Sequence, residues 1–370
     1  MARPLQATID LSAVRQNFGV ARDHASDARL WAVVKANAYG HGLLRTAHAL
    51  AGCADGFAVI ELDGAIALRE AGLQQPILLL EGFYSDDELP DFAEYRLTPV
   101  LHSLEQVQAI VEACLPGKLP VYLKLNTGMN RLGLNANEFR AALTALQDAS
   151  QISTITLMAH FANADADIAV MPDAVAAPLD TFATLRRKTV HSAGLPQSLA
   201  NSAALLCFPE TIGSETDWAR PGIMLYGSSP FPEQQTAEAL GLRPVMTLSS
   251  ALIAVRDIGP GDTVGYGATF TADAPMRIGF VAGGYGDGYP RHAPSGTPVL
   301  VDGRRTRLIG RVSMDKICVD LTHLPDAAPG SPVVLWGEGL SVDEVASAAG
   351  TISYELFCAL TARVPIYEVG

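Results

Sequence analysis

Trp31-Ala32-Val33-Val34-Lys35-Ala36-Asn37-Ala38-Tyr39-Gly40-His41-Gly42 joins an apolar run to a lysine and then to a loop of small residues. The run Leu30–Val34 is continuous and rich in β-branched side chains, which predicts a strand buried on both faces. Lys35 then stands where the strand emerges, and poor solvation there lowers the pKa of an amine and favours Schiff-base chemistry. A lysine that extends its charge to water is the alternative, and it is the commoner arrangement.

Similar apolar runs recur as far as about Gly227, with helix-like segments such as Ser103–Cys114 and Ala136–Asp148 between them. The candidate strands are Leu30–Val34, Phe57–Ile60, Ile77–Leu80, Thr98–Leu101, Val121–Leu125, Ile155–His160, Ser198–Ala200 and Gly222–Tyr226. This alternation predicts an α/β fold with a (β/α)8 TIM barrel. A doubly wound open sheet has the same alternation, but no G-x-G-x-x-G loop follows the first strand.

Polar residues follow several of these strands. Lys35, Arg131 and His160 fall at or just beyond predicted carboxyl ends, where barrel active sites are built. Ser202 follows the seventh candidate strand, and Gly222-Ile223 lies at the eighth. Barrels often bind phosphate at these two places, so the sequence predicts a phosphate site there.

The character of the chain changes after about Arg243. Short β-branched runs alternate with turn signals such as Pro260-Gly261-Asp262 and Asp302-Gly303, which predicts a mostly antiparallel β domain. We therefore expect a barrel over residues 1–235 and a C-terminal β domain over residues 236–370, with the junction in Ser229–Gly241.

Composition narrows the range of partners and compartments. The 370 residues carry 26 Lys+Arg against 39 Asp+Glu, a net charge of −13, which argues against a nucleic acid or an anionic membrane as partner. The five cysteines are odd in number and lack C-x-x-C spacing, and no histidine pair has metal-site spacing, so neither a disulfide framework nor a metal site is expected. No signal-peptide core and no run near ~20 apolar residues occurs, so we expect a cytoplasmic protein.

The opening stretch resembles the cofactor-lysine segment of alanine racemases, which interconvert L- and D-alanine with pyridoxal 5′-phosphate. Eight further segments continue the resemblance in order along the chain: Lys124–Gly133, His160–Ala162, Asn201–Ser202, Trp218–Gly227, Val264–Gly267, Gly284–Arg291, Gly310–Asp315 and Ile352–Glu355. One such segment is weak evidence, whereas nine in register are specific. The resemblance implies a barrel followed by a β domain, with residues 1–10 adding a strand to that domain.

The resemblance also implies a homodimer with shared active sites and two catalytic groups, Lys35 on one face of the substrate and Tyr266 of the partner subunit on the other. His160 contacts that tyrosine and Arg220 contacts His160. Arg220 also faces the ring nitrogen of the cofactor and keeps it unprotonated, which suppresses side reactions such as transamination. Without the resemblance, Tyr266 reads as a ring packed on the sheet and His160 equally well as a core histidine.

The remaining site residues are assigned by the same likeness. The cofactor phosphate is assigned to the hydroxyls of Tyr39, Ser202 and Tyr354 and to the backbone N–H groups of Gly222 and Ile223. The substrate carboxylate is assigned to Arg131 and the N–H of Met314. Lys124 matches a lysine that is often carbamylated and then positions Arg131, although Asn126 stands where many relatives have aspartate. The narrow entry corridor is assigned to Tyr285, Arg291, Arg311, Ile352 and Tyr354.

Three other functions stay open at this point. A broad-specificity or serine racemase differs only weakly in sequence. A non-catalytic barrel that binds pyridoxal phosphate lacks the β domain, and a barrel-type decarboxylase does not need the Val264–Gly267 loop together with Arg220. The favoured reading is an alanine racemase that either supplies D-alanine for peptidoglycan or degrades it.

Overall fold

The computed structural model describes residues 3–167, 169–189, 192 and 194–370. Two compact units divide the chain. The barrel unit comprises Arg15–Ala38 and Gly42–Leu225, and the β unit comprises the residues up to Val14, Tyr39–His41 and Tyr226–Gly370. Tyr39 therefore belongs to the β unit although Lys35, four positions earlier, belongs to the barrel unit.

Short and largely buried segments form the barrel strands. Among the described residues these are β2 (Arg29–Val33), β3 (Gly56–Val59), β4 (Ile77–Leu79), β5 (Leu97–Leu101), β6 (Leu119–Lys124), β7 (Ile152–Met158), β8 (Gln197–Ser198) and β9 (Trp218–Ala219). In β3, β4, β5 and β9 every residue is buried. They pair in the order β8-β7-β6-β5-β4-β3-β2-β9, and every pairing is parallel. A further parallel bridge between Asn201 and Arg220 links the chain beyond β8 to the chain beyond β9. The predicted TIM barrel is confirmed.

Large side chains fill part of the barrel interior. The ring of Trp31 stacks on Trp218 at a centroid distance of 4.1 Å and meets Tyr122 edge-on at 6.0 Å. The indole Nε1 of Trp31 also donates to the Tyr122 hydroxyl over 3.0 Å. A Cβ added to Gly56 would lie 2.3 Å from the Trp31 ring, so only glycine fits there. This part of the barrel interior is therefore packed core, and an active site is expected at the carboxyl ends of the strands.

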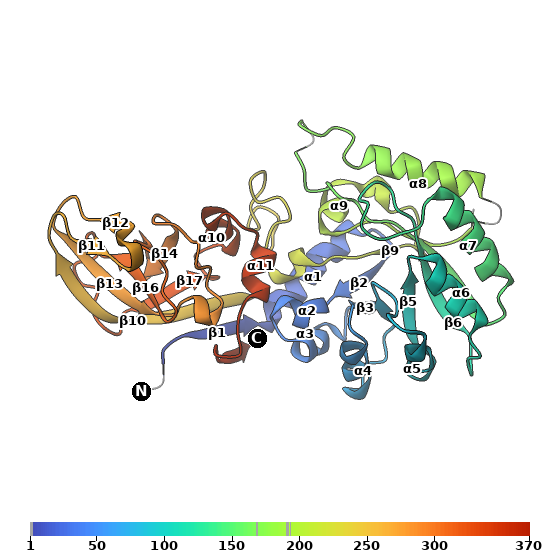
Figure 1. The fold of residues 1–370 in the computed structure, drawn as a ribbon, viewed down its shortest axis with the longest axis horizontal. Coiled ribbons are helices and arrows are strands. Elements are labelled where there is room, and N and C mark those ends of the chain that lie inside the picture. Colours follow the sequence, from blue (N-terminus) through green and yellow to red (C-terminus); the bar gives the residue numbers. More distant parts are fainter. Residues whose placement is uncertain (1–2, 168, 190–191, 193) are drawn as a thin grey trace. The chain divides into compact units, whose positions relative to one another are not determined.

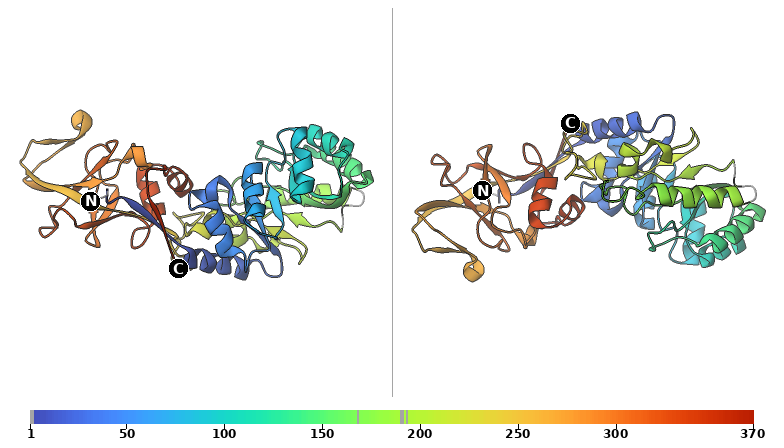
Figure 2. Two further views of the ribbon diagram at one scale, coloured as in Figure 1. Left: turned by 90° about the horizontal axis from the view of Figure 1, so that it is seen from below. Right: turned by 90° about the horizontal axis from the view of Figure 1, so that it is seen from above.

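Helices cover the outside of the barrel strands (Figures 1 and 2). Their bounds are α1 (Leu11–His24), α2 (Lys35–Tyr39), α3 (Leu43–Leu50), α4 (Leu62–Glu70), α5 (Leu89–Glu94), α6 (Leu104–Glu112), α7 (Ala136–Asp148), α8 (Ala176–Lys188) and α9 (Ser202–Cys207), with 3-10 turns η1 (Asp86–Glu88) and η2 (Pro209–Thr211). Side chains define two of their starts. Ser103 caps α6, and Asn135 forms a capping box with Glu138 at α7.

The predicted eighth strand, Gly222–Tyr226, is wrong. The eighth strand is β9, and the later segment forms the 3-10 turn η3 (Ile223–Tyr226). Pro221 has no N–H for a sheet ladder, and the N–H of Gly222 donates to the Ser202 hydroxyl instead. The segment is apolar because it is fully buried, which periodicity alone does not separate from a strand.

The β unit is a mostly antiparallel sheet, as predicted (Figure 1). Its strands are β1 (Gln6–Asp10), β10 (Met246–Ile258), β11 (Thr263–Val264), β12 (Phe270–Thr271), β13 (Met276–Ala282), β14 (Pro298–Val301), β15 (Arg304–Arg307), β16 (Lys316–Asp320), β17 (Pro332–Trp336) and β18 (Ile366–Val369). It also holds α10 (Val342–Ala349), α11 (Ser353–Cys358), η4 (Tyr266–Ala268) and η5 (Tyr285–Asp287). The amino-terminal strand β1 pairs antiparallel with β10 and parallel with β18.

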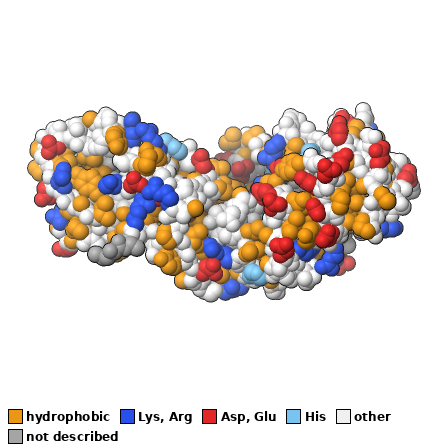
Figure 3. All heavy atoms as spheres, turned by 60° about the horizontal axis from the view of Figure 1, so that its bottom comes forward, with side chains coloured by type: hydrophobic (Ala, Val, Ile, Leu, Met, Phe, Trp, Pro, Cys, Tyr) orange, Lys and Arg blue, Asp and Glu red, His pale blue; other side chains and the backbone are white. Residues whose placement is uncertain are grey.

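In the part of the chain that the structure describes, no helix has both the length and the apolar character needed to cross a bilayer. On the face drawn in Figure 3, acidic and basic side chains are interspersed with apolar ones and form no extended basic area.

Candidate active site

Arg220 links the carboxyl ends of three barrel strands. It follows β9, and its guanidinium donates to the Ser198 hydroxyl of β8 over 2.6 Å and to the carbonyl oxygen of Ala159, just beyond β7, over 2.8 Å. A third donor bond reaches the carbonyl of Leu199 at 3.2 Å. The side chain is buried, and burial lowers the pKa of the guanidinium to about 10. These bonds use both Nη atoms, and Nε has no hydrogen-bond partner among the described residues.

His160 lies beside this arginine and is held in one protonation state. Its Nδ1 is 3.4 Å from Nη2 of Arg220. Burial lowers the pKa of His160, and the positive charges of Arg220, Lys124, Arg131 and Lys35 act in the same direction, so that the pKa falls to about 3. The ring is therefore neutral near pH 7. Because Arg220 can only donate, Nδ1 accepts and Nε2 carries the ring hydrogen.

A second cluster of cations surrounds Lys124, the last residue of β6. Lys124 is buried, and burial lowers the pKa of its amine to about 8, with the charges of Arg220 and Arg131 acting in the same direction. Lys124, Arg131 and His160 line a cavity of about 200 Å³ together with Asn126 and Thr127. The structure thus brings these three predicted residues together, with a substantial fraction of Lys124 neutral near pH 8.

The loop that carries Arg131 is built by Asn126. Its side-chain oxygen accepts from the N–H groups of Gly128 and Asn130 at 3.0 and 3.1 Å, and its amide donates to the Asn130 side chain. A Cβ on Gly133 would lie 2.8 Å from the backbone nitrogen of Asn126. Asn126 therefore shapes the turn, whereas the sequence indicated only a lost negative charge.

Lys35 begins a turn of left-handed backbone. The φ angles of Ala36, Asn37, Ala38 and Tyr39 are 51°, 54°, 53° and 49°. Four successive non-glycine residues of this kind cost about 1–2 kcal/mol each, so the surrounding structure has to impose the turn. The sequence predicted a loop of small residues here, and the observed turn fixes the backbone directly after the lysine.

Ser202 and Gly222 meet at the carboxyl ends of β8 and β9. The N–H of Gly222 donates to the Ser202 hydroxyl oxygen over 2.8 Å, and both residues are buried. The serine keeps its own hydrogen for a further acceptor. The two residues are thus brought together as expected, but this N–H already has a partner within the chain.

In the β unit, Tyr39 lies between two other tyrosine rings. Its centroid is 4.8 Å from that of Tyr226 and 5.7 Å from that of Tyr354. His41 supports the same group, because its ring stacks on Tyr226 at 4.6 Å and its Nδ1 lies 2.8 Å from the Tyr39 carbonyl oxygen. Burial raises the pKa of the Tyr39 hydroxyl, which keeps it protonated and able to donate to an anion.

Tyr266 projects from the β unit. It lies in η4, between β11 and β12, with Gly265 and Gly267 both at a φ of 74°. The tyrosine is 68% exposed, so the alternative of a ring packed on the sheet is excluded within this unit. A Cβ on Gly267 would lie 3.4 Å from the guanidinium of Arg311, which places the predicted corridor arginine beside this turn.

Several other predicted residues of the β unit are also exposed. Met314 is 51% and Ile352 is 61% exposed, so Ile352 is not core. The Arg291 guanidinium lies over the ring of Tyr285 at 5.9 Å. The backbone of Tyr285 donates to the carbonyl of Ser313, next to Met314. Exposed apolar side chains of this size are typical of a surface that another chain or a ligand covers.

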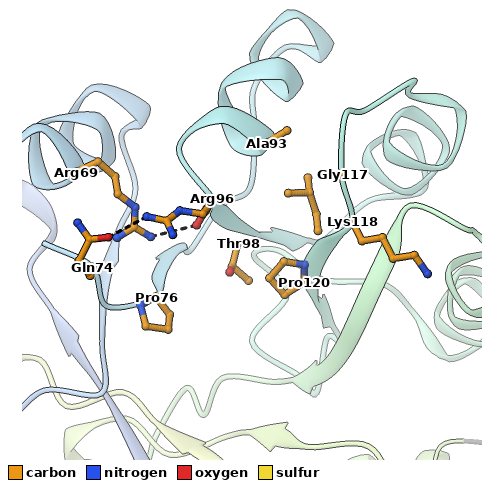
Figure 4. Close-up of a pocket in the computed structure, with 10 residues that line it drawn as sticks. Arg69, Gln74, Pro76, Ala93, Arg96, Thr98, Gly117, Lys118 and Pro120 are labelled. Carbon is orange, nitrogen blue, oxygen red and sulfur yellow. Dashed lines mark hydrogen bonds between the residues drawn. The ribbon is translucent and has the colours of Figure 1, made fainter. Parts of the chain in front are cut away.

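A separate cavity lies at the amino ends of β4, β5 and β6 (Figure 4). Its volume is about 660 Å³, and Arg69, Arg96, Thr98, Lys118 and Pro120 are among the residues that line it. Arg69 donates hydrogen bonds to the backbone carbonyl oxygens of four residues: Leu73, Gln75, Tyr95 and Arg96. None of the predicted site residues lines this cavity, and the amino end of a barrel usually serves stability.

Two family models match the chain over most of its length. The alanine racemase N-terminal domain matches residues 9–230, and the alanine racemase C-terminal domain matches residues 245–367. The chain belongs to the alanine racemase family. It is 55% identical over 369 residues to a protein of Nitrosomonas eutropha named alanine racemase, which covers 100% of both chains. It is 49% identical over 368 residues to a catabolic alanine racemase of Klebsiella aerogenes, which covers 99% of each.

Solved structures of alanine racemases are also similar to the chain over its full length. The biosynthetic alanine racemase of Pseudomonas aeruginosa has 47% identity and a TM-score of 0.94 over 100% of both chains. That of Acinetobacter baumannii has 37% identity and a TM-score of 0.90, covering 99% of this chain and 100% of the other.

Sequence reasoning missed several supports of this racemase-like site. Ser198, His41 and Tyr226 contact predicted residues directly, yet each reads in the sequence as an ordinary strand or loop residue. His41 lies inside the opening stretch, and its position two residues after Tyr39 was the one available signal. The hydrogen bond of Ser198 and the ring contacts of Tyr226 depend on tertiary structure that no local pattern contains.

Proposed function

We propose that this chain interconverts L- and D-alanine with pyridoxal 5′-phosphate, using one proton-transfer group from each of two subunits. Two observations support the proposal: in the barrel unit the buried Arg220 lies against His160, and in the β unit an exposed tyrosine, Tyr266, stands on a glycine-flanked turn. Racemisation needs the Cα proton to leave one face and return on the other. Lys35 serves one face, and Tyr266 of the partner subunit serves the other.

His160 supports the tyrosine as a neutral donor. With a pKa of about 3 it cannot act as a general acid near pH 7. Because Arg220 fixes its tautomer, Nε2–H is free to donate to a phenolate oxygen, which favours the ionised tyrosine. Arg220 thereby acts on the tyrosine through the imidazole.

The residues present fit the cofactor. Nε of Arg220 is a donor without a protein partner in the described chain, and the protonated hydroxyls of Ser202, Tyr39 and Tyr354 suit a phosphate group. The N–H of Ile223 and that of Gly222, after exchange of its serine bond, complete the proposed set. When bound, pyridoxal phosphate supplies delocalisation of the negative charge left on Cα.

Arg131 and Met314 orient the substrate. The guanidinium of Arg131 pairs with the substrate carboxylate, and the N–H of Met314 donates to it. A carbamate on Lys124 gives Arg131 an anionic partner, and the pKa of about 8 leaves the amine nucleophilic enough to form one. Tyr285, Arg291, Arg311, Ile352 and Tyr354 form the narrow entry that favours a methyl side chain.

A broad-specificity racemase is the second candidate function. It would share the catalytic and cofactor-binding residues, and only the residues that line the entry corridor would differ. Relatives named biosynthetic and catabolic resemble the chain to nearly the same degree, so either D-alanine supply for peptidoglycan or D-alanine breakdown fits the proposal. We place the enzyme in the cytoplasm as a homodimer.

The proposal is tested by proton NMR of the purified chain with L-alanine in D₂O, followed by chiral analysis. Loss of the α-proton signal together with formation of D-alanine is expected. Exchange without inversion would show that only one face works and that Tyr266 is misassigned. If protein that holds pyridoxal phosphate shows neither α-proton exchange nor D-alanine formation, the proposed substrate is contradicted. Parallel runs with L-serine and L-lysine would distinguish a broad-specificity racemase from an alanine racemase.

A further inference from the structure

Asp343 is a buried carboxylate that the catalytic assignments do not use. It lies in the first turn of α10 and is 6% exposed. Its hydrogen-bond donors are neutral hydroxyl and N–H groups, among them the Ser228 hydroxyl at 2.5 Å to Oδ1 and the Ser229 N–H at 3.0 Å to Oδ2. It makes no ion pair with any described residue. An unpaired buried carboxylate is costly, and burial raises its pKa, so its presence calls for a compensating role.

The carboxylate joins two segments that support the tyrosine cluster. Ser228 follows Tyr226 by two positions, and the Ser228 hydroxyl lies 2.6 Å from the Ser353 hydroxyl. Ser353 is the first residue of α11 and directly precedes Tyr354. All three side chains are buried, so water cannot replace these bonds readily. One carboxylate thus fixes the backbone behind both rings that flank Tyr39.

We propose that Asp343, through Ser228 and Ser353, is the positioning residue that holds the Tyr354 hydroxyl where it meets the phosphate of the cofactor. The inference rests on the proposed function, which assigns that phosphate to Tyr354. The tyrosine ring has rotational freedom only about its side-chain bonds once the start of α11 is fixed. Packing of that ring on Tyr39 at 5.7 Å then sets its direction.

The test compares two ligands that differ only in the phosphate. Dissociation constants of pyridoxal phosphate and of pyridoxal are measured by equilibrium dialysis with the full chain, for wild type, Asp343→Asn and the milder Ser353→Ala. We expect Asp343→Asn to weaken pyridoxal phosphate binding about tenfold and pyridoxal binding less than about twofold. Ser353→Ala is expected to give the same phosphate-selective loss, and it keeps the test valid if Asp343→Asn does not fold.

Asp320→Asn is the matched control. Asp320 is also a buried carboxylate of the β unit, but its partners are Arg307 and Thr322. Its substitution is expected to leave both dissociation constants unchanged. In a Tyr354→Phe background, Asp343→Asn should add little further loss, because the hydroxyl it positions is absent.

The outcomes separate this inference from the proposed function. Equal losses for both ligands, no loss for either, or additive losses in the double variant would overturn the role of Asp343. A wild-type chain that binds neither ligand would overturn the proposed function and this role with it.

Discussion

At the scale of single residues, Arg220 determines what its neighbours can do. Its two Nη atoms are anchored to strands β7 and β8, so the guanidinium cannot rotate away from His160. Burial of the imidazole, together with the positive charge next to it, then excludes a second proton on the ring. A histidine that reads in the sequence equally well as a core residue is thus a fixed neutral donor.

The first prediction concerns the tyrosine that this donor is proposed to serve. Tyr266→Phe removes one of the two proton-transfer groups and should lower the rate of racemisation about 10²–10⁴-fold, with pyridoxal phosphate still bound. The rate is measured by chiral analysis in both directions, and retention of the cofactor by absorbance. Tyr84→Phe is the control, since Tyr84 is 66% exposed and its hydroxyl donates to the carboxylate of Glu81. Unchanged activity of Tyr266→Phe would contradict the two-group assignment.

The second prediction concerns Lys124. An amine with a pKa of about 8 becomes protonated as the pH falls below that value, and only the neutral form attacks carbon dioxide. In ¹³C-bicarbonate buffer, ¹³C NMR should therefore show a bound carbamate signal that grows as the pH rises through 8. Lys124→Met should lack it. The same signal in Lys124→Met, or none in wild type at the higher pH, would contradict a carbamate on this lysine.

At the scale of structural elements, the turn after Lys35 is the least expected part of the site. Small residues make it possible, because Ala36 and Ala38 tolerate left-handed backbone better than branched residues do. Propensity alone predicts an irregular loop, since isolated left-handed turns are unfavourable. The buried neighbours of Tyr39 supply the compensating packing.

Side-chain substitutions at Ala36 test this geometry. Ala36 is exposed, so Ala36→Gly should be neutral or stabilising, whereas Ala36→Val should lower the free energy of unfolding by about 1–2 kcal/mol. The matched control position is Ala141, which is exposed in the right-handed helix α7. There Ala141→Gly should be more destabilising than Ala141→Val and should lower the free energy of unfolding by about 1 kcal/mol. Urea denaturation measures both pairs. The same rank order at the two positions would contradict a left-handed turn.

Ion pairs stabilise a second element of the proposed site, the η5 turn (Tyr285–Asp287). Asp287 is 1% exposed, and it accepts from both Nη atoms of Arg3 at 2.5 Å and from the Gly284 N–H at 3.0 Å. Arg363 lies 3.4 Å from the same carboxylate and 2.5 Å from Asp315. Both chain ends are thereby tied to the η5 turn that carries Tyr285.

Removal of this carboxylate should destabilise the β unit. Asp287→Ala leaves the guanidinium groups of Arg3 and Arg363 without their shared partner. We expect the free energy of unfolding to fall by about 3 kcal/mol. This value is near the lower end for buried ion pairs because the two arginines are partly exposed. Asp315→Ala, which removes the exposed partner of Arg363, should have a much smaller effect. Urea unfolding followed by circular dichroism compares the two, and equal losses would contradict the special role of the buried carboxylate.

At the scale of the whole molecule, the sequence predicts the architecture better than the site. Seven of the eight barrel strands follow from apolar runs, and α7 from its amphipathic pattern, because burial and periodicity are local properties. Gly222–Tyr226 fails for the same reason: its residues are buried, but the backbone turns. The contacts of Arg220 with Ser198 and Ala159 arise only when the barrel closes, so no local pattern contains them.

The central claim is that each active site takes Lys35 from one subunit and Tyr266 from the other, and mixing of two inactive variants tests it most directly. Lys35→Ala and Tyr266→Ala chains are purified separately, unfolded together, reassembled with pyridoxal phosphate and assayed for D-alanine formation. Random pairing of a symmetric dimer gives half heterodimers with one intact site each, so about a quarter of wild-type activity is predicted. Each variant reassembled alone should stay inactive. Reassembled mixtures that contain heterodimers but show no more activity than the separate variants would contradict the claim.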